Sequence, residues 1–203
     1  YVWCRRTDEL MDSPEAQQRP VRELSERLDA WEGRTRRLFE GHVSDDLDRV
    51  MVDTLERYPQ PLQPYLDMIE GMRMDLTTTR YASFEQLYLY CYRVAGTVGL
   101  MMCGVLGVSE ARALTYAVDL GLGMQLSNIC RDVKEDAAMG RVYLPATRLE
   151  AHGTSTQAVL DGTAPVEAVS AVVRELLDLG EHCYERARLG MRDIPFRPRL
   201  AIL

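Results

Sequence analysis

Basic residues and histidines are scarce in this sequence. Lysine and arginine total 24 against 31 aspartates and glutamates, which gives a formal net charge of −7. A nucleic-acid surface needs a clustered excess of positive charge, so this balance argues against a nucleic-acid partner. The three histidines, His42, His152 and His182, show no metal-ligand spacing. A histidine-based metal centre is therefore not predicted.

The cysteines do not form the pattern of a disulfide framework. They are odd in number and widely spread, and most lie inside apolar runs. This pattern is typical of buried thiols in a reducing compartment. The five are Cys4, Cys91, Cys103, Cys130 and Cys183.

No apolar run is long enough to predict a membrane-spanning helix. The longest, Val94 to Val108, has about 15 residues and contains four glycines, whereas a spanning helix needs about 20 mainly apolar residues. The chain also opens on "YVWCRRTDEL", without an initiating Met or a signal peptide, and closes on "RPRLAIL". We therefore expect a fragment, truncated at both ends, without a transmembrane segment.

Alternating strand patterns, internal repeats and low-complexity tracts are also absent, whereas apolar residues recur at helical spacing. With 203 residues and 46% hydrophobic content, the chain can bury the core of one domain, 1–203. The sequence predicts an all-α fold. The expected helices span 21–39, a segment capped by Ser44 that ends before Pro59, 65–76, 84–103 with a capping box at Ser83 and Gln86, 109–138 capped by Ser109, and 165–189.

The stretch "LSNICRDVKED", residues 126–136, places an amide and two carboxylates four residues apart. On a helix Asn128, Asp132 and Asp136 share one face, with Gln125 one turn earlier. Like charges at this spacing repel each other, and the helix C-terminus adds roughly a few tenths of a kcal/mol against ionisation. The preceding sequence is mostly apolar, which predicts burial rather than a solvated face.

A second acid pair, Asp8 and Asp12, has the same spacing in a helix that Pro14 ends. A single pair of this kind usually lies on a solvated face. Two pairs near helix ends, with Arg5 and Arg141 close to them in the sequence, indicate a shared cation. Oxygen ligands select hard cations, so Mg²⁺ is predicted, with Mn²⁺ second, shared with a substrate diphosphate.

Four longer motifs extend these acid pairs: "DELMD" at 8–12, "YCYRVAGTVG" at 90–99, "NICRDVKED" at 128–136 and "GRVYLP" at 140–145. Together they resemble the squalene/phytoene synthase family of head-to-head trans-prenyltransferases. "YVWCRRTDEL" and "GMRMDL" are most similar to the plant, algal and cyanobacterial branch of that family. The resemblance covers essentially the whole chain.

The resemblance implies an isoprenoid-synthase helical bundle in which two aspartate-rich helices face each other across a cavity. It implies a Mg²⁺-dependent transferase that condenses two geranylgeranyl diphosphates head to head (1-1′), through prephytoene diphosphate, to 15-cis-phytoene. This would be the first committed step of carotenoid biosynthesis, and it needs no NADPH.

The same resemblance implies roles for individual residues. The catalytic aspartates would be Asp8, Asp12, Asp132 and Asp136, and these would hold the metal together with Asn128. The diphosphate-binding residues would be Arg5, Gln125, Arg141 and Tyr143. The residues lining the prenyl cavity would be Tyr90, Val94, Val98 and Gly99.

Simpler explanations stay open for several of these residues. Gly99 with Gly96 could serve close helix packing, Tyr90 and Tyr143 could be core aromatics, Arg141 could cap a helix C-terminus, and Gln125 could satisfy buried backbone groups. For the whole protein, the alternatives are a squalene or dehydrosqualene synthase, the former with NADPH, or a catalytically inactive helical scaffold.

Kinship also sets the expected surroundings of the protein. A plant or algal source would place it in the plastid, the chloroplast, and a bacterial source in the cytoplasm or at a membrane periphery. Other enzymes of the carotenoid pathway are the expected protein partners. The water-insoluble C40 product is compatible with peripheral membrane association, although no amphipathic anchor is evident.

Overall fold

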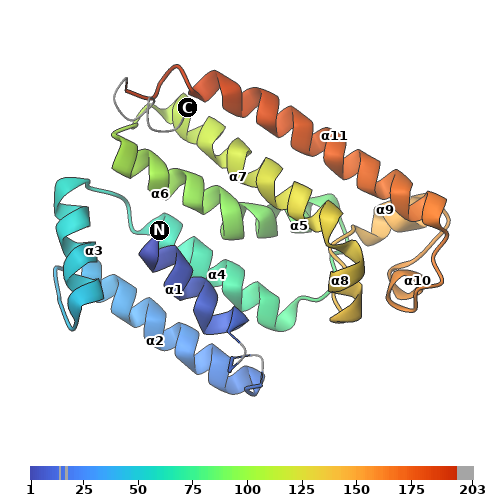
Figure 1. Ribbon diagram of the computed structural model, residues 1–203, viewed down its shortest axis with the longest axis horizontal. Coiled ribbons are helices and arrows are strands. Elements are labelled where there is room, and N and C mark those ends of the chain that lie inside the picture. Colours follow the sequence, from blue (N-terminus) through green and yellow to red (C-terminus); the bar gives the residue numbers. More distant parts are fainter. Residues whose placement is uncertain (14, 17, 196–203) are drawn as a thin grey trace.

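The computed structural model describes residues 1–195, apart from residues 14 and 17 and the side chain of Asp12. This part of the chain is helical (Figure 1), which confirms the predicted all-α class. Within it no sheet forms, and an isolated bridge joins Arg80 to Val142. The elements are α1 (Val2–Asp12), α2 (Val21–Phe39), α3 (Asp46–Arg57), α4 (Gln63–Thr77), α5 (Phe84–Cys91), the π-helix η1 (Tyr92–Gly96), α6 (Thr97–Leu106), α7 (Ala111–Arg131), α8 (Val133–Ala138), α9 (Ala146–Ala151), α10 (Thr156–Leu160) and α11 (Val166–Gly190).

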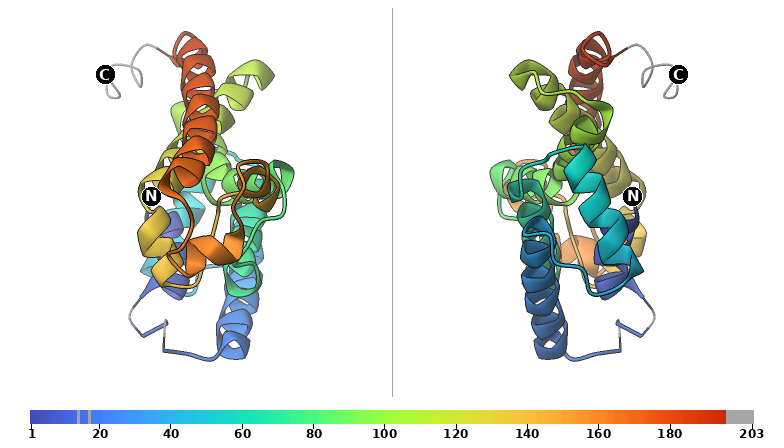
Figure 2. Two further views of the ribbon diagram at one scale, coloured as in Figure 1. Left: turned by 90° about the vertical axis from the view of Figure 1, so that its right-hand side faces the viewer. Right: turned by 90° about the vertical axis from the view of Figure 1, so that its left-hand side faces the viewer.

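The two longest helices, α7 and α11, lie side by side along one edge of the molecule (Figures 1 and 2). The Arg186 Nε donates a hydrogen bond of 2.8 Å to the Asp119 carboxylate, which is 7% exposed. The Ser127 and Tyr184 hydroxyl oxygens are 3.1 Å apart. Because a buried carboxylate needs a partner, these contacts fix how α11 sits on α7.

Two large apolar clusters form most of the core of the described residues, and Val94 packs against both of them. A third, small cluster consists of Cys103, Val108 and Ala113. The N-terminal cluster joins α1, α2, α3, α4 and α6 around two indoles. The Trp31 Nε1 donates to the Thr7 hydroxyl at 2.8 Å, and the Trp3 Nε1 donates to the Thr35 hydroxyl at 3.3 Å. The second cluster joins α5, α7 and α11 to the segment after α8. The single domain over 1–203 stays a prediction.

One continuous helical stretch in the described residues, Phe84–Leu106, is long and apolar enough to cross a membrane, with a mean hydropathy of 1.4. It comprises α5, the π-helical turn and α6. A share of 33% of its apolar window is buried inside the molecule. Core helices of soluble proteins meet the same criterion, so this finding alone does not assign the segment to a membrane.

Two helix starts lie one residue after the predicted caps. Helix α3 follows Asp45 rather than Ser44, and α7 follows Glu110 rather than Ser109. Asp45 takes the capping position because its carboxylate accepts a hydrogen bond from the Asp48 N–H at 3.0 Å.

The predicted capping box at the start of α5 forms only in part. Ser83 occupies the N-cap position, but its side chain makes no capping hydrogen bond. The Gln86 side chain accepts instead from the Ala82 N–H at 2.9 Å, one residue before the cap. The helix start was predicted correctly, and its hydrogen bonding was not.

Glu175 joins α11 to α9 through two partners. Its carboxylate accepts hydrogen bonds from Arg148 at 2.7 and 2.6 Å, and one oxygen lies 2.8 Å from the His152 Nε2. The hydrogen bonds from Arg148, and then from His152, lower the Glu175 pKa from 4.5 to about 2. A lowered carboxyl pKa stabilises the fold above the unfolded value, and this stabilisation is lost as the pH falls through the folded value.

We expect Glu175→Gln to lower the free energy of unfolding by about 0.5–1 kcal/mol near pH 6, because partly exposed ion pairs are screened by solvent. The difference in unfolding free energy between the variant and the wild type should shrink as the pH falls from 4.5, the unfolded pKa of Glu175, to about 2, its folded pKa. Urea unfolding on both sides of this window measures it. A difference that stays constant or grows towards acidic pH would contradict the prediction.

Candidate active site

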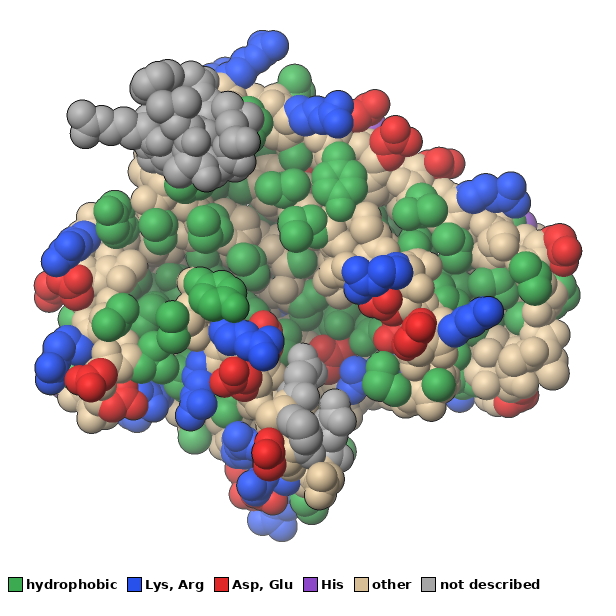
Figure 3. All heavy atoms as spheres, viewed as in Figure 1, with side chains coloured by type: hydrophobic (Ala, Val, Ile, Leu, Met, Phe, Trp, Pro, Cys, Tyr) green, Lys and Arg blue, Asp and Glu red, His purple; other side chains and the backbone are tan. Residues whose placement is uncertain are grey.

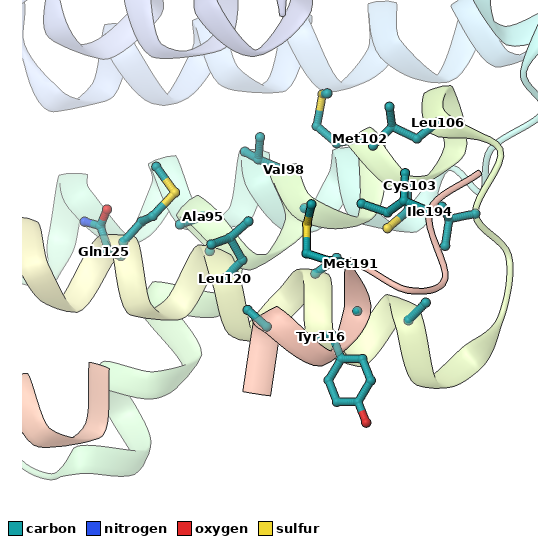
Figure 4. Close-up of a pocket in the computed structure, with 18 of the residues that line it drawn as sticks. Ala95, Val98, Met102, Cys103, Leu106, Tyr116, Leu120, Gln125, Met191 and Ile194 are labelled. Carbon is teal, nitrogen blue, oxygen red and sulfur yellow. The ribbon is translucent and has the colours of Figure 1, made fainter. Parts of the chain in front are cut away.

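An apolar cavity of about 450 Å³ lies between α6 and α7, beside the C-terminal end of α11 (Figure 4). It contains Val94, Val98 and Gly99, three of the four residues predicted to line a prenyl cavity. Figure 4 places Gln125 at one end of the cavity and Leu106 at the other. The full lining is Val94, Ala95, Val98, Gly99, Met102, Cys103, Leu106, Val108, Ala113, Tyr116, Ala117, Leu120, Gly121, Met124, Gln125, Asn128, Ala187, Gly190, Met191 and Ile194.

The cavity is open to the surface along one side. Met102, Leu120 and Met124 line it and are 45%, 46% and 54% exposed. Gln125 and Asn128 are polar lining residues, and both lie in the last two turns of α7. The cavity therefore has an apolar body with amide side chains at the end of α7 that leads into the acidic residues.

Gly99 serves both roles that the sequence left open. It lines the cavity, and a Cβ at this position would lie 2.3 Å from the Ala117 carbonyl oxygen. Close packing of α6 on α7 therefore requires glycine here. The missing side chain brings the two helices together and also gives the wall its shape.

Asn128, Asp132 and Asp136 keep their four-residue relation, but the continuous helix predicted over 109–138 is wrong. The helix breaks at Asp132, where φ is −99° and ψ is 14°, between α7 and α8. Backbone hydrogen bonds still connect Asp132 N–H to the Asn128 oxygen at 2.9 Å, and Asp136 N–H to the Asp132 oxygen at 2.8 Å. The backbone therefore keeps its four-residue repeat through the break.

The two carboxylates differ in their surroundings. Both oxygens of Asp132 accept hydrogen bonds of 2.6 Å from Arg131, and these lower the Asp132 pKa. Burial, and then the charge of Asp132, raise the pKa of Asp136. Asp136 lines a small recess that also contains Arg141 and Tyr143. The structure thus brings Asp136 together with two residues predicted to bind a diphosphate.

The first acid pair lies on α1. Asp8 is partly buried, and the side chain of Asp12 lies outside the described residues. Arg5 is exposed, and its Nε lies 3.3 Å from a carboxylate oxygen of Glu9, one turn along the same helix. In this structure Arg5 therefore pairs within α1.

Helices α1 and α8 lie on the same face of the molecule (Figures 1 and 2). The space-filling view shows that face hollowed between them, with apolar side chains in the hollow and charged ones at its edges (Figure 3). The two helices that carry the acid pairs therefore lie on the same side of the molecule, not on opposite sides. This arrangement is compatible with a site shared by both.

Tyr90 is not part of the cavity lining and packs instead in a group of aromatic rings. Its ring lies 5.4 Å from Tyr81 and 5.2 Å from Tyr143, centroid to centroid, and Tyr81 and Tyr143 are 5.5 Å apart. These three residues are called the tyrosine stack below. Tyr90 is 4% exposed and Tyr143 is 9% exposed. Tyr90 and Tyr143 therefore pack as buried core aromatics, the alternative that the sequence left open.

Asp75 is a polar residue of this region that the sequence reasoning missed. Its carboxylate accepts hydrogen bonds of 3.3 Å from Tyr90 and from Tyr143. The signal was the acid of "GMRMDL", near the C-terminal end of α4. Its significance depends on partners far away in the chain, so spacing alone did not reveal it.

The side chains of the acidic residues offer oxygen atoms, the type of ligand that a hard cation prefers. Within the described residues, which leave out the Asp12 side chain, no three His, Cys, Asp or Glu side chains are grouped so as to hold a metal ion. Asp136 nevertheless carries negative charge that Asp132 makes less favourable, and Asn128, Asp132 and Asp136 can each offer an oxygen ligand. Such residues suit a divalent cation whose remaining ligands come from a substrate rather than from a complete protein cage.

Comparisons with known proteins agree with this picture. A family model described as squalene/phytoene synthase matches residues 1–203. A 15-cis-phytoene synthase of Synechococcus elongatus is 46% identical over 206 residues, which cover 96% of this chain and 65% of that protein. The chloroplastic phytoene synthase 3 of Zea mays is 55% identical over 168 residues, 80% of this chain and 38% of that protein. The chain thus spans about two thirds or less of the length of these curated relatives.

Two solved structures share the fold. The squalene synthase HpnC of Alicyclobacillus acidocaldarius superposes with a TM-score of 0.88 at 27% identity, over 99% of this chain and 73% of that one. A dehydrosqualene synthase in complex with a ligand superposes with a TM-score of 0.77 at 31% identity, over 97% of this chain and 66% of that one. The predicted helical bundle is confirmed.

Proposed function

The chain belongs to the squalene/phytoene synthase family, and on that basis we propose that the full-length protein condenses two geranylgeranyl diphosphates head to head to 15-cis-phytoene. The observation that carries the proposal is the cavity of about 450 Å³, apolar along its length. Its amide residues lie in the helix that leads into Asp132 and Asp136. An apolar prenyl chain and a charged diphosphate need such a combination.

The diphosphate half of the substrate would lie near α8. Arg141 lines the recess beside Asp136 and Tyr143, and its planar guanidinium suits hydrogen bonds to phosphate oxygens. Asp8 and Asp12 on one side, and Asn128, Asp132 and Asp136 on the other, would hold the metal ions. Bound Mg²⁺ or Mn²⁺ supplies positive charge that stabilises the departing diphosphate.

The prenyl half would lie in the cavity. Breaking an allylic C–O bond leaves a carbocation that water would capture, so the wall must exclude water. Val94, Val98 and Gly99 supply apolar wall. The amide of Gln125, at one end of the cavity in Figure 4, can donate to a diphosphate oxygen there.

The test is incubation of the full-length protein with geranylgeranyl diphosphate and Mg²⁺, without and with NADPH, followed by extraction of hydrocarbons. We expect phytoene in both samples and none after chelation of the metal. A folded protein without product would contradict the proposal and favour the inactive scaffold.

A squalene or dehydrosqualene synthase is the second candidate, because both solved relatives carry those activities in their names. The fold alone does not separate the candidates. Identity is 27% and 31% to those two proteins and 46% and 55% to the two phytoene synthases. Conversion of farnesyl diphosphate in preference to geranylgeranyl diphosphate would support the second candidate.

The setting follows from the same proposal. Relatives include a chloroplastic plant enzyme and a cyanobacterial one, so a plant or algal source would place this protein in the plastid, and a bacterial source in the cytoplasm or at a membrane. Met102, Leu120 and Met124 expose apolar surface at the open side of the cavity. That surface suits release of a C40 hydrocarbon to a membrane, and other carotenoid enzymes would receive the product.

A further inference from the structure

The Asp75 carboxylate connects the tyrosine stack to the small recess lined by Asp136, Arg141 and Tyr143, which is called the diphosphate recess below. Tyr90 donates to one oxygen of Asp75 and Tyr143 donates to the other, each at 3.3 Å. These distances are long for O–H···O hydrogen bonds, as is common for catalytic groups before a substrate binds. Asp75 therefore contacts both phenols at once, one with each carboxylate oxygen.

Asp75 fixes the direction of the phenol hydrogens in this group. The Tyr90 and Tyr143 hydroxyl oxygens are also 3.4 Å apart, but each hydroxyl has a single hydrogen, and an ionised carboxylate can only accept. Either both phenols donate to Asp75, or Tyr90 donates to Tyr143, which then donates to Asp75. In both arrangements the Tyr143 hydrogen points at Asp75, and a lone pair of its oxygen is left to accept from another donor.

Arg141 is such a donor. Arg141 lines the same recess as Tyr143. Burial acts to lower the Arg141 pKa, but its interactions with Tyr143 and Asp75, which include a hydrogen bond to Tyr143, raise it overall. Asp136 lines this recess as well, and the Arg141 charge opposes the rise of the Asp136 pKa. Arg141 thus interacts with Asp75 and Tyr143 as well as with the proposed metal-binding acid Asp136.

We propose that Asp75 is a positioning residue, which sets the hydrogen direction of Tyr90 and Tyr143 and thereby holds Arg141 towards the diphosphate recess. This inference rests on the proposed function. Asp75 would not touch the substrate, because it acts through the phenols and the guanidinium. An asparagine in its place keeps the shape but presents an N–H₂ group, which would reverse the hydrogen of one phenol.

The test compares Asp75→Asn with Tyr143→Phe and with the double variant in the full-length enzyme, using geranylgeranyl diphosphate and Mg²⁺. We expect each single variant to lose about tenfold to a hundredfold in kcat, since small misplacements of positioned groups have effects of that size. The KM of Asp75→Asn should not rise, because removing a negative charge beside Arg141 does not weaken anion binding. The double variant should be no slower than the slower single variant.

The matched control is Asp67→Asn on the same helix. Asp67 accepts a hydrogen bond of 3.0 Å from Tyr92, so this variant breaks the same kind of contact outside the group. We expect its kcat to stay within about twofold of the wild type, as for substitutions away from the reacting groups. Thermal unfolding of both variants shows whether their stability losses are alike.

The outcomes distinguish a failure of the proposed function from a failure of the role proposed for Asp75. A wild type without turnover overturns the proposed function and this inference with it. An active wild type with an equally active Asp75→Asn variant overturns the inference alone, and so do fully additive losses in the double variant. If Asp75→Asn does not fold, Tyr90→Phe with Tyr143→Phe keeps the ring stack and removes both hydroxyls, and full activity of that protein overturns the inference.

Discussion

Replacing Asp136 by asparagine in the full-length enzyme is expected to lower turnover by a factor of about a hundred to a thousand, the loss typical of a group that stabilises transition-state charge. The same change should leave the fold as stable as the wild type or more stable. Burial and the charge of Asp132 both raise the Asp136 pKa, so its ionised form is disfavoured in the folded protein. Asparagine keeps the size of the side chain and removes that repulsion.

The control is Glu135→Gln, which makes the same change of charge at an exposed position next to Asp136 on α8. We expect its turnover to stay near that of the wild type. Titration with Mn²⁺ and inorganic diphosphate gives a second reading, in which Asp136→Asn should bind the pair less tightly than Glu135→Gln. Equal turnover and equal binding in both variants would remove Asp136 from the metal site.

The sequence predicted the long helices well because their apolar spacing extends over several turns. The 21–39 prediction coincides with α2, and the 165–189 prediction differs from α11 by one residue at each end. Helices α9 and α10 were missed, since six and five residues are too few to show a helical period. The break at Asp132 was missed for another reason. The four-residue acid spacing continues across it, and hydrogen bonds at this spacing persist there.

Within the site, too, the sequence predicted relations between nearby residues and missed contacts between distant ones. The relation between Asn128, Asp132 and Asp136 is visible in the sequence because each step is one helical turn. The group around Asp75 combines residues that are 15 and 68 positions apart in the chain, and no local pattern encodes such a contact. The placement of Tyr90 outside the cavity lining has the same origin. Its neighbour Tyr143 comes from a segment after α8 that only the folded chain brings close.

Alanine at Gly121 is expected to lower the free energy of unfolding by about 3 kcal/mol, the upper part of the range for overpacked cores. A Cβ there would lie 2.4 Å from the Ala95 carbonyl oxygen and 2.7 Å from the Gly96 nitrogen. Both atoms belong to the backbone of the π-helical turn, so no side chain can rotate away. Helix α7 would have to move off that turn, and the cavity wall to which Ala95 and Gly121 contribute would open.

Gly33→Ala is the matched control, because glycine in a helix interior costs about 1 kcal/mol relative to alanine when space is free. The nearest atom to a Cβ at Gly33 is the Arg37 Nη1 at 3.6 Å, so this variant should be as stable as the wild type or up to about 1 kcal/mol more stable. Calorimetric unfolding should therefore lower the midpoint of Gly121→Ala by about 6–12 °C and leave that of Gly33→Ala unchanged or raised. An unchanged midpoint for Gly121→Ala would mean that α7 and the π-helical turn lie farther apart in solution, and that the cavity between α6 and α7 is wider than this packing allows.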